Sequence, residues 1–187
     1  NGADDDIYVL QGDGRTGFYK HSISANSWTT LSSTPAAISV TGAMIRNGSD
    51  NDIYVLQGGS ATGFYKYSIS DDSWTTLAAP PTTIFSGIMI RNGSDDDIYT
   101  YRAGSSNSFF KYSISSDSWT TLTVIPATAS SGSVMIRNGS DDEIYLARGS
   151  NSTGFYKYSI SGNSWTTLAV VPASVNTATA MSRNGSD

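Results

Sequence analysis

Apolar and polar positions along this chain fall into short segments of β-strand length, separated by stretches rich in glycine, asparagine, aspartate and serine. Between residues 40 and 77 the pattern predicts four strands, at Val40–Arg46, Asp52–Gln57, Gly63–Ser70 and Ser73–Leu77. The IYVL segment from 53 to 56 is apolar at every position, so both of its alternating faces are apolar. This predicts a strand that other layers of structure cover on both sides.

The same pattern occurs four times. The tryptophans are separated by 46, 45 and 46 residues, and each follows an Ile-Tyr pair and an FYKYSIS-like run. The repeated positions are Trp28, Trp74, Trp119 and Trp165, with the pairs starting at Ile7, Ile53, Ile98 and Ile144, and the runs at Phe18, Phe64, Phe109 and Phe155. A fixed period of this length with four strands predicts an all-β, four-bladed β-propeller of four-stranded antiparallel blades.

The two ends of the chain predict how the ring closes. The first repeat lacks a strand before Ile7, and a surplus strand-like segment, Thr177–Arg183, lies at the C-terminus. We expect this segment to pair antiparallel beside Asp6–Gln11 and complete a single domain. The repeats would then comprise 1–39 with 177–187, 40–84, 85–130 and 131–176. Alternatively, Thr177–Arg183 completes a blade of a neighbouring chain.

The repeat text resembles a known family. IYVLQGG at 53–59, followed by YKYSISDDSWTTLAAPP at 65–81, is similar to the kelch repeat, in which a Gly-Gly strand precedes a tyrosine strand and a tryptophan strand. The similarity covers the whole chain and implies a propeller fold. The double glycine is intact only at Gly58-Gly59, and the other repeats have Gly12-Asp13, Ala103-Gly104 and Arg148-Gly149. The tryptophan strand is expected at the outside of each blade, with its indole packed between blades.

Connections at the two ends of a blade differ in charge. One end of each blade holds the connections between strands one and two and between strands three and four. These connections contain 15 of the 16 acidic residues and four recurring arginines, so the formal net charge of this end is about −11. The opposite end has Asp13, three arginines and apolar loops. We expect face-to-face association with copies of this chain through those loops. The predicted contact residues are Ile84, Phe85, Val124, Ile125, Val170 and Val171.

Asn-X-Ser/Thr sequences recur in the turns, which predicts an N-glycosylated protein located extracellularly or at the cell surface. The predicted glycosylation sites are Asn47, Asn92, Asn138, Asn184 and Asn151. The chain has no cysteine, and nothing in it approaches the apolar length of a membrane span. A formal net charge of −5 argues against nucleic acid as a partner.

Little in the sequence favours catalysis. His21 is the one histidine and replaces a recurring tyrosine, so we expect a half-buried strand residue. The acidic runs Asp4–Asp6, Asp95–Asp97 and Asp141–Glu143 lack the alternating spacing of calcium loops. We therefore expect no catalytic residues, no metal site and no cofactor. The expected function is a non-enzymatic structural protein that self-associates into fibres or a surface layer.

Two alternatives remain. The first is an adhesion or carbohydrate-binding module that engages glycans or another surface protein through the variable connections at 11–17, 57–63, 102–108 and 148–154. The second is a fragment of a larger kelch-type propeller.

Overall fold

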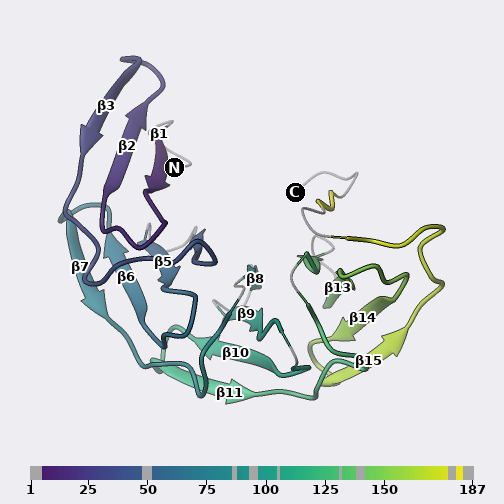
Figure 1. Ribbon diagram of the computed structural model, residues 1–187. Coiled ribbons are helices and arrows are strands. Elements are labelled where there is room, and N and C mark those ends of the chain that lie inside the picture. The colour runs from purple at the N-terminus through teal and green to yellow at the C-terminus, as the bar shows by residue number, and fades with distance from the viewer. Residues whose placement is uncertain are drawn as a thin grey trace. The chain divides into compact units, whose positions relative to one another are not determined.

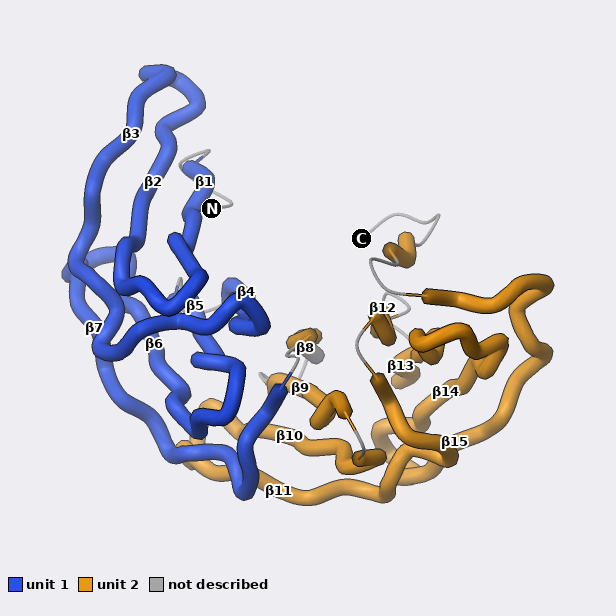
Figure 2. Tube along the Cα trace, in the orientation of Figure 1, with its two compact units in different colours: residues 1–87 blue, residues 88–187 orange. Residues whose placement is uncertain are grey.

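The computed structural model consists of β-strands and their connections (Figure 1). It describes residues 6–47, 52–85, 88–92, 97–104, 106–130, 132–137, 142–176 and 180–182. No helix occurs in these ranges, and hence none that is long and apolar enough to cross a membrane. The chain forms two compact units, residues 1–87 and 88–187, which Figure 2 shows in different colours.

The first unit contains two antiparallel sheets. The first sheet has the order β1-β2-β3 and the second has the order β4-β5-β6-β7. Their strands are β1 (Asp6–Leu10), β2 (Phe18–Ser22), β3 (Ser27–Thr30), β4 (Ala43–Arg46), β5 (Asp52–Leu56), β6 (Phe64–Ser68) and β7 (Ser73–Thr76). The four strands predicted between 40 and 77 are confirmed, each with slightly shorter bounds.

The second unit repeats this arrangement with two four-stranded sheets, ordered β8-β9-β10-β11 and β12-β13-β14-β15. The strands are β8 (Met89–Asn92), β9 (Asp97–Tyr101), β10 (Phe109–Ser113), β11 (Ser118–Thr121), β12 (Val134–Arg137), β13 (Glu143–Ala147), β14 (Phe155–Ser159) and β15 (Ser164–Thr167). In every sheet the tryptophan strand lies at one edge, as the repeat pattern predicts.

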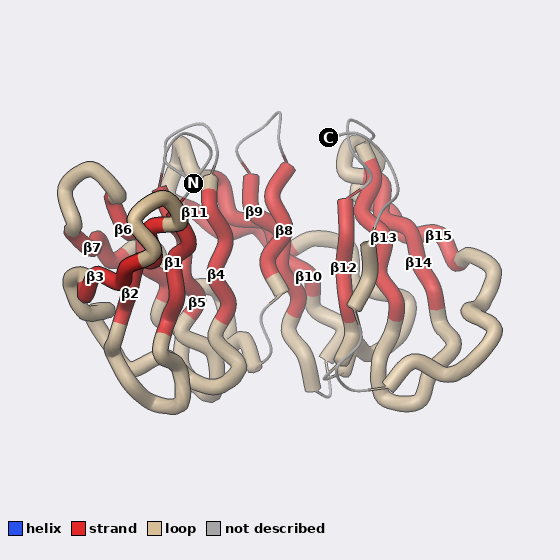
Figure 3. Tube along the Cα trace, turned by 90° about the horizontal axis from the view of Figure 1, so that it is seen from above, coloured by secondary structure: helices blue, strands red, loops and turns tan. Residues whose placement is uncertain are grey.

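Burial follows the alternation of the sequence. All five residues of β5 and of β9 are buried, which confirms that both faces of the IY strand are covered there. Within each sheet, consecutive strands are antiparallel and joined by short connections (Figure 3). The connections of one sheet therefore alternate between its two ends, as expected.

Each unit has its apolar core between its two sheets. In the first unit, Ile53, Val55 and Tyr67 of the second sheet pack with Phe18 and Ile38 of the first repeat. In the second unit, the equivalent residues Ile144, Leu146 and Tyr158 pack with Phe109 and Ala129. Because an apolar face of one sheet is buried against the next, two neighbouring repeats form the smallest unit with a closed core.

The first sheet contains three strands in the described part of the chain. Most of the segment predicted to complete it, Thr177–Arg183, lies outside the described residues, and Ala180–Ser182 form no strand. The pairing of this segment with β1 therefore stays a prediction.

Candidate functional site

Consecutive sheets in the first unit are joined by hydrogen bonds at their tryptophan edges. Trp74 Nε1 on β7 donates to the backbone oxygen of Ser32 at 2.8 Å. The backbone nitrogen of Ser32 donates to Asp72 Oδ1 at 2.9 Å. Asp72 occupies the turn before β7 with a positive φ of 45°, which directs its carboxylate back toward the neighbouring sheet. We call this two-way contact the clamp.

The second unit has the same clamp. Trp165 Nε1 donates to the backbone oxygen of Thr123 at 3.0 Å, and the backbone nitrogen of Thr123 donates to Asn163 Oδ1 at 2.9 Å. Asn163 also has a positive φ, of 43°. An asparagine thus makes in one unit the contacts that an aspartate makes in the other, so the clamp requires an acceptor oxygen rather than a charge.

Aromatic contacts support each clamp. The Trp74 ring lies edge-on to Phe18 of the preceding sheet, with centroids 5.1 Å apart, and Trp165 lies in the same way against Phe109. Tyr67 packs edge-on against Phe18 at 4.8 Å and donates its hydroxyl to Asp72 at 2.8 Å. Burial and the Asp72 carboxylate raise the pKa of Tyr67, whereas the hydrogen bond from the Ser32 backbone lowers the pKa of Asp72.

Replacing Asp72 with asparagine should retain the clamp and reduce its sensitivity to acid. The folded-state pKa of Asp72 is lowered, so its contribution to stability is present above the unfolded value near 3.8 and is lost as pH falls toward the folded value. Urea unfolding near pH 7 and pH 3 should show a smaller acid loss for Asp72→Asn than for the wild-type protein. Asp71→Asn, in the same turn, is the control. An acid loss equal to wild type in Asp72→Asn would contradict this role.

Among the described residues of the first unit, no other element covers the apolar face of the first sheet. Ile7 is 50% exposed and Trp28 is 61% exposed, whereas the equivalent Ile53 and Ile144 are 2% and 1% exposed. Val9 and Ile23 are exposed as well, and His21 is half-buried on the same face, its ring 4.9 Å from Trp28. The half-buried position expected for His21 is confirmed. We call Ile7, Val9, Ile23 and Trp28 the open face.

This exposure was not foreseen from the sequence. The prediction that tryptophans pack between blades is confirmed for Trp74 and Trp165 within their units. Within the described residues of the first unit, no sheet covers Trp28, which is 61% exposed, so for this tryptophan the packing between blades stays a prediction. The first repeat has the same residue types as the others at these positions. Its exposure therefore depends on which sheet lies beside it and is not visible in the local sequence.

The predicted contact residues in the apolar loops separate into two groups. Phe85, Val124 and Val170 are exposed, and Val171 is half-buried. Ile84 and Ile125 are 1% and 0% exposed, so the prediction that they form an association surface is wrong. These two side chains are part of the protein interior, because each connection directs one of its apolar residues inward.

The predicted glycosylation sites differ in their exposure. Asn47 is 1% exposed and its Nδ2 atom is buried, which argues against a glycan on this side chain in the folded blade. Asn151 is exposed in the connection between β13 and β14. Asn138, Asn184 and the side chain of Asn92 lie outside the described residues.

One acidic residue per repeat forms an ion pair within its own sheet. A lysine on the third strand of the repeat contacts an acid at the start of the second strand, at distances from 2.5 to 2.9 Å. The pairs are Lys20–Asp6, Lys66–Asp52, Lys111–Asp97 and Lys157–Glu143. The hydrogen bond from Lys157 lowers the pKa of Glu143. Four of the acids are therefore paired with lysines of their own sheets. With these four lysines included, the formal net charge at the acidic end is about −7 rather than −11.

Among the described residues, no group of three or more histidine, cysteine, aspartate or glutamate residues is placed to hold a metal ion. Of the acidic runs, Asp6, Asp97, Asp142 and Glu143 are described, and the remaining members lie outside the described residues. The Ser161 backbone nitrogen donates to Asp142 Oδ2 at 2.8 Å, so this carboxylate also serves a turn.

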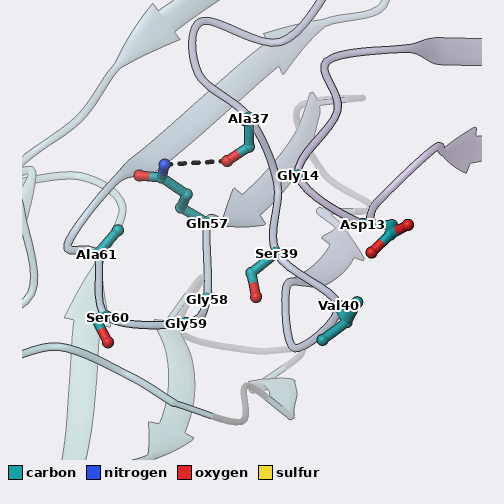
Figure 4. Close-up of a pocket in the computed structure, with 10 residues that line it drawn as sticks. All are labelled: Asp13, Gly14, Ala37, Ser39, Val40, Gln57, Gly58, Gly59, Ser60 and Ala61. Atoms are coloured by element: carbon teal, nitrogen blue, oxygen red, sulfur yellow. Dashed lines mark hydrogen bonds between the residues drawn. The ribbon is translucent and has the colours of Figure 1, made fainter.

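A pocket of about 570 Å³ lies at the end of the first unit opposite the acidic connections, where connections of its two repeats meet (Figure 4). It is lined by Asp13, Gly14, Ala37, Ser39, Val40, Gln57, Gly58, Gly59, Ser60 and Ala61. Gln57 Nε2 donates to the backbone oxygen of Ala37 at 3.0 Å, which fixes one wall. Asp13 is the one acidic side chain of the lining, and no aromatic residue is present.

Comparison with known proteins defines the class. No protein-family model matches the chain, and no curated protein matches it. A solved structure of YjhT superposes with a TM-score of 0.70 over 91% of this chain, at 16% sequence identity. The chain spans 64% of the length of YjhT. At this identity the match shows the fold: the chain is an all-β protein of the four-bladed β-propeller class, as the repeat predicts.

Proposed function

We propose that this chain is a non-catalytic interaction module of kelch-type propeller repeats that assembles with copies of itself outside the cell, in fibres or a surface layer. The observation that carries this proposal is the open face of the first sheet. The same repeat positions are buried or half-buried between sheets in both units, so the open face has the composition of a surface that is covered.

The composition of the open face suits a protein partner. Tryptophan is the residue most enriched among those that dominate binding energy, and Trp28 lies among aliphatic neighbours. A contiguous apolar patch on a soluble protein marks an interaction surface, whereas isolated exposed residues need no explanation. Phe85, Val124 and Val170 belong to separate connections of different repeats, so the loops offer a weaker surface than the open face.

Charge plays a smaller part in this proposal than the sequence indicates. Each described ion pair removes one negative charge from the acidic end, and Asp72 and Asp117 are hydrogen-bonded to tyrosine hydroxyls. Exposed charges are screened over about 8–10 Å at physiological salt. Apolar burial therefore supplies most of the affinity, and the remaining acids orient the encounter.

A second candidate is a ligand-binding module, favoured by the pocket at Gly58. Its volume of about 570 Å³ falls within the usual range for small-molecule sites. The lining offers the Asp13 carboxylate and the Ser39 and Ser60 hydroxyls, but no aromatic ring on which a sugar can stack. This reading makes the protein an adhesion or carbohydrate-binding module.

Association is tested by light scattering on the protein secreted from a eukaryotic host. We expect an assembly whose mass per chain includes a glycan at Asn151, lost in Asn151→Gln. Ile7→Asp and Ile23→Asp, each checked for an intact fold by circular dichroism, should be monomeric. Val124→Asp should assemble like wild type. A monomeric wild type at high concentration, or loss of assembly in Val124→Asp alone, would refute the open face as the association surface.

A further inference from the structure

The pocket at Gly58 lies within the first unit, and backbone hydrogen bonds hold its walls together. The Gly14 nitrogen donates to the Ile38 oxygen at 2.8 Å, and the Ser39 nitrogen donates to the Gln57 oxygen at 2.9 Å. The three connections that line the pocket are therefore joined to one another. The pocket is preformed, as small-molecule sites usually are.

One carboxylate, that of Asp13, lines this pocket. Asp13 is exposed, and its side chain has no ion pair or hydrogen bond among the described residues. The lining contains no arginine, lysine or histidine, so no positive charge inside the pocket offsets the carboxylate. A positively charged ligand would therefore meet an acid that has no other partner.

The backbone conformation does not explain why an aspartate stands at this position. Asp13 has a positive φ of 50° and lies between Gly12 and Gly14, which have positive φ as well. The equivalent residues of the second and third repeats are Gly59 and Gly104, again with positive φ. Glycine adopts this conformation with less strain than aspartate does, so the fold alone favours glycine here. What aspartate adds at this position is its carboxylate.

The rest of the lining suits an aliphatic stem with a hydrogen-bond donor at its end (Figure 4). Val40 is 76% exposed, and the methyl groups of Ala37 and Ala61 line the same pocket. The hydroxyls of Ser39 and Ser60 are acceptors on the same lining. An ammonium has three donors and no acceptor, so it can use a carboxylate and a hydroxyl together.

The equivalent position in the second unit carries the opposite charge. Gly104 stands in place of Asp13, and Arg148 stands in place of Gln57. Arg148 Nε donates to the Thr128 oxygen at 2.8 Å, which is the bond that Gln57 makes in the first unit. An arginine without the carboxylate repels a cation, so we expect one ammonium site per chain.

We propose that the pocket at Gly58 binds a primary ammonium group on an aliphatic stem, as in a lysine side chain of a partner protein. The ammonium contacts Asp13 and the Ser39 hydroxyl, and its methylene groups pack against Val40. A single charge is favoured over a diamine because Arg15, exposed two residues after Asp13, repels a second cation. The four lysines of this chain are each paired with an acid of their own sheet, so the lysine comes from another protein. This inference rests on the second candidate function, a ligand-binding module, and names its ligand.

Nuclear magnetic resonance titration tests the site, because the amides of Gly14, Gly58 and Gly59 lie in it. At constant pH and ionic strength, n-butylammonium chloride should shift these amides in a saturable way. n-Butanol, which has the same stem without the charge, should bind several-fold more weakly. A lysine blocked at both backbone ends should bind like n-butylammonium, and 1,4-diaminobutane should bind no more tightly.

Asp13→Gly is the variant that removes the carboxylate, and it gives the first repeat the glycine that two other repeats have. It should weaken n-butylammonium binding about two- to five-fold, the range expected for an exposed ion pair. Asp71→Asn removes an exposed carboxylate from the acidic end and is the matched control. It should bind n-butylammonium as the wild-type protein does.

The outcomes separate this inference from the candidate function on which it rests. Equal binding of n-butanol, unchanged binding in Asp13→Gly, or equal shifts with potassium chloride would overturn the ammonium site. Tighter binding of 1,4-diaminobutane than of the blocked lysine would overturn the partner protein as the source of the ammonium. If glucose shifts these amides and n-butylammonium does not, the ligand assignment is wrong and the ligand-binding candidate stands. If none of these compounds shifts them, both fail.

Discussion

Replacing Trp74 with alanine is expected to lower the free energy of unfolding by about 3–5 kcal/mol, because a large aromatic side chain between two sheets leaves a space that cannot close. The substitution removes the hydrogen bond to Ser32 and the edge-on contact with Phe18 together. The Ser32 oxygen would then have no partner in the clamp. Urea unfolding followed by far-ultraviolet circular dichroism measures the loss.

Trp28→Ala is the matched control for this prediction. Trp28 occupies the same repeat position but is 61% exposed, so its removal should change the stability of the isolated chain by about 0.5 kcal/mol or less. The comparison is made at dilution, where copies do not associate. Equal losses in the two variants would show that Trp28 is covered in solution, and a small loss in Trp74→Ala would show that the clamp does not hold the sheets together.

The sequence repeat by itself predicts the fold. The period, the doubly apolar IY strand and the turn-rich connections predicted four strands per repeat and the tryptophan strand at the edge, because these are local properties of the chain. The ion pair between Lys66 and Asp52 was missed, although its signal repeats four times. Asp52 pairs with Ser68, so Lys66 is its diagonal neighbour on one face, and this geometry requires the register.

Local sequence could not predict the open face or which loop residues point inward. Ile7 and Ile53 stand in the same repeat text, and only the presence of a preceding sheet makes one exposed and the other buried. Likewise Ile84 and Phe85 are adjacent apolar residues of one connection, and the path of the backbone decides which of them points inward. The residue type decides whether a side chain is apolar, whereas its burial depends on which elements pack together in the fold.

Replacing Gly58 with alanine is expected to have the second large effect on stability, lowering the free energy of unfolding by about 2–5 kcal/mol. Gly58 has a positive φ of 73°, which costs a residue with a side chain about 1–2 kcal/mol. An added Cβ would also lie 2.5 Å from the nitrogen of Gly42 and 2.6 Å from the carbonyl carbon of Thr41. These are backbone atoms and must move, which adds about 1–3 kcal/mol.

Gly12→Ala separates the two causes. Gly12 is the equivalent residue of the first repeat, with a φ of 65° and no atom within 4 Å of an added Cβ. Its substitution should therefore show the backbone cost alone, about 1–2 kcal/mol. The difference between the two variants in urea unfolding measures the close approach of the 57–63 connection to Thr41 and Gly42. Equal losses would show that this approach is looser in solution, and that Gly58 is required only for its backbone conformation.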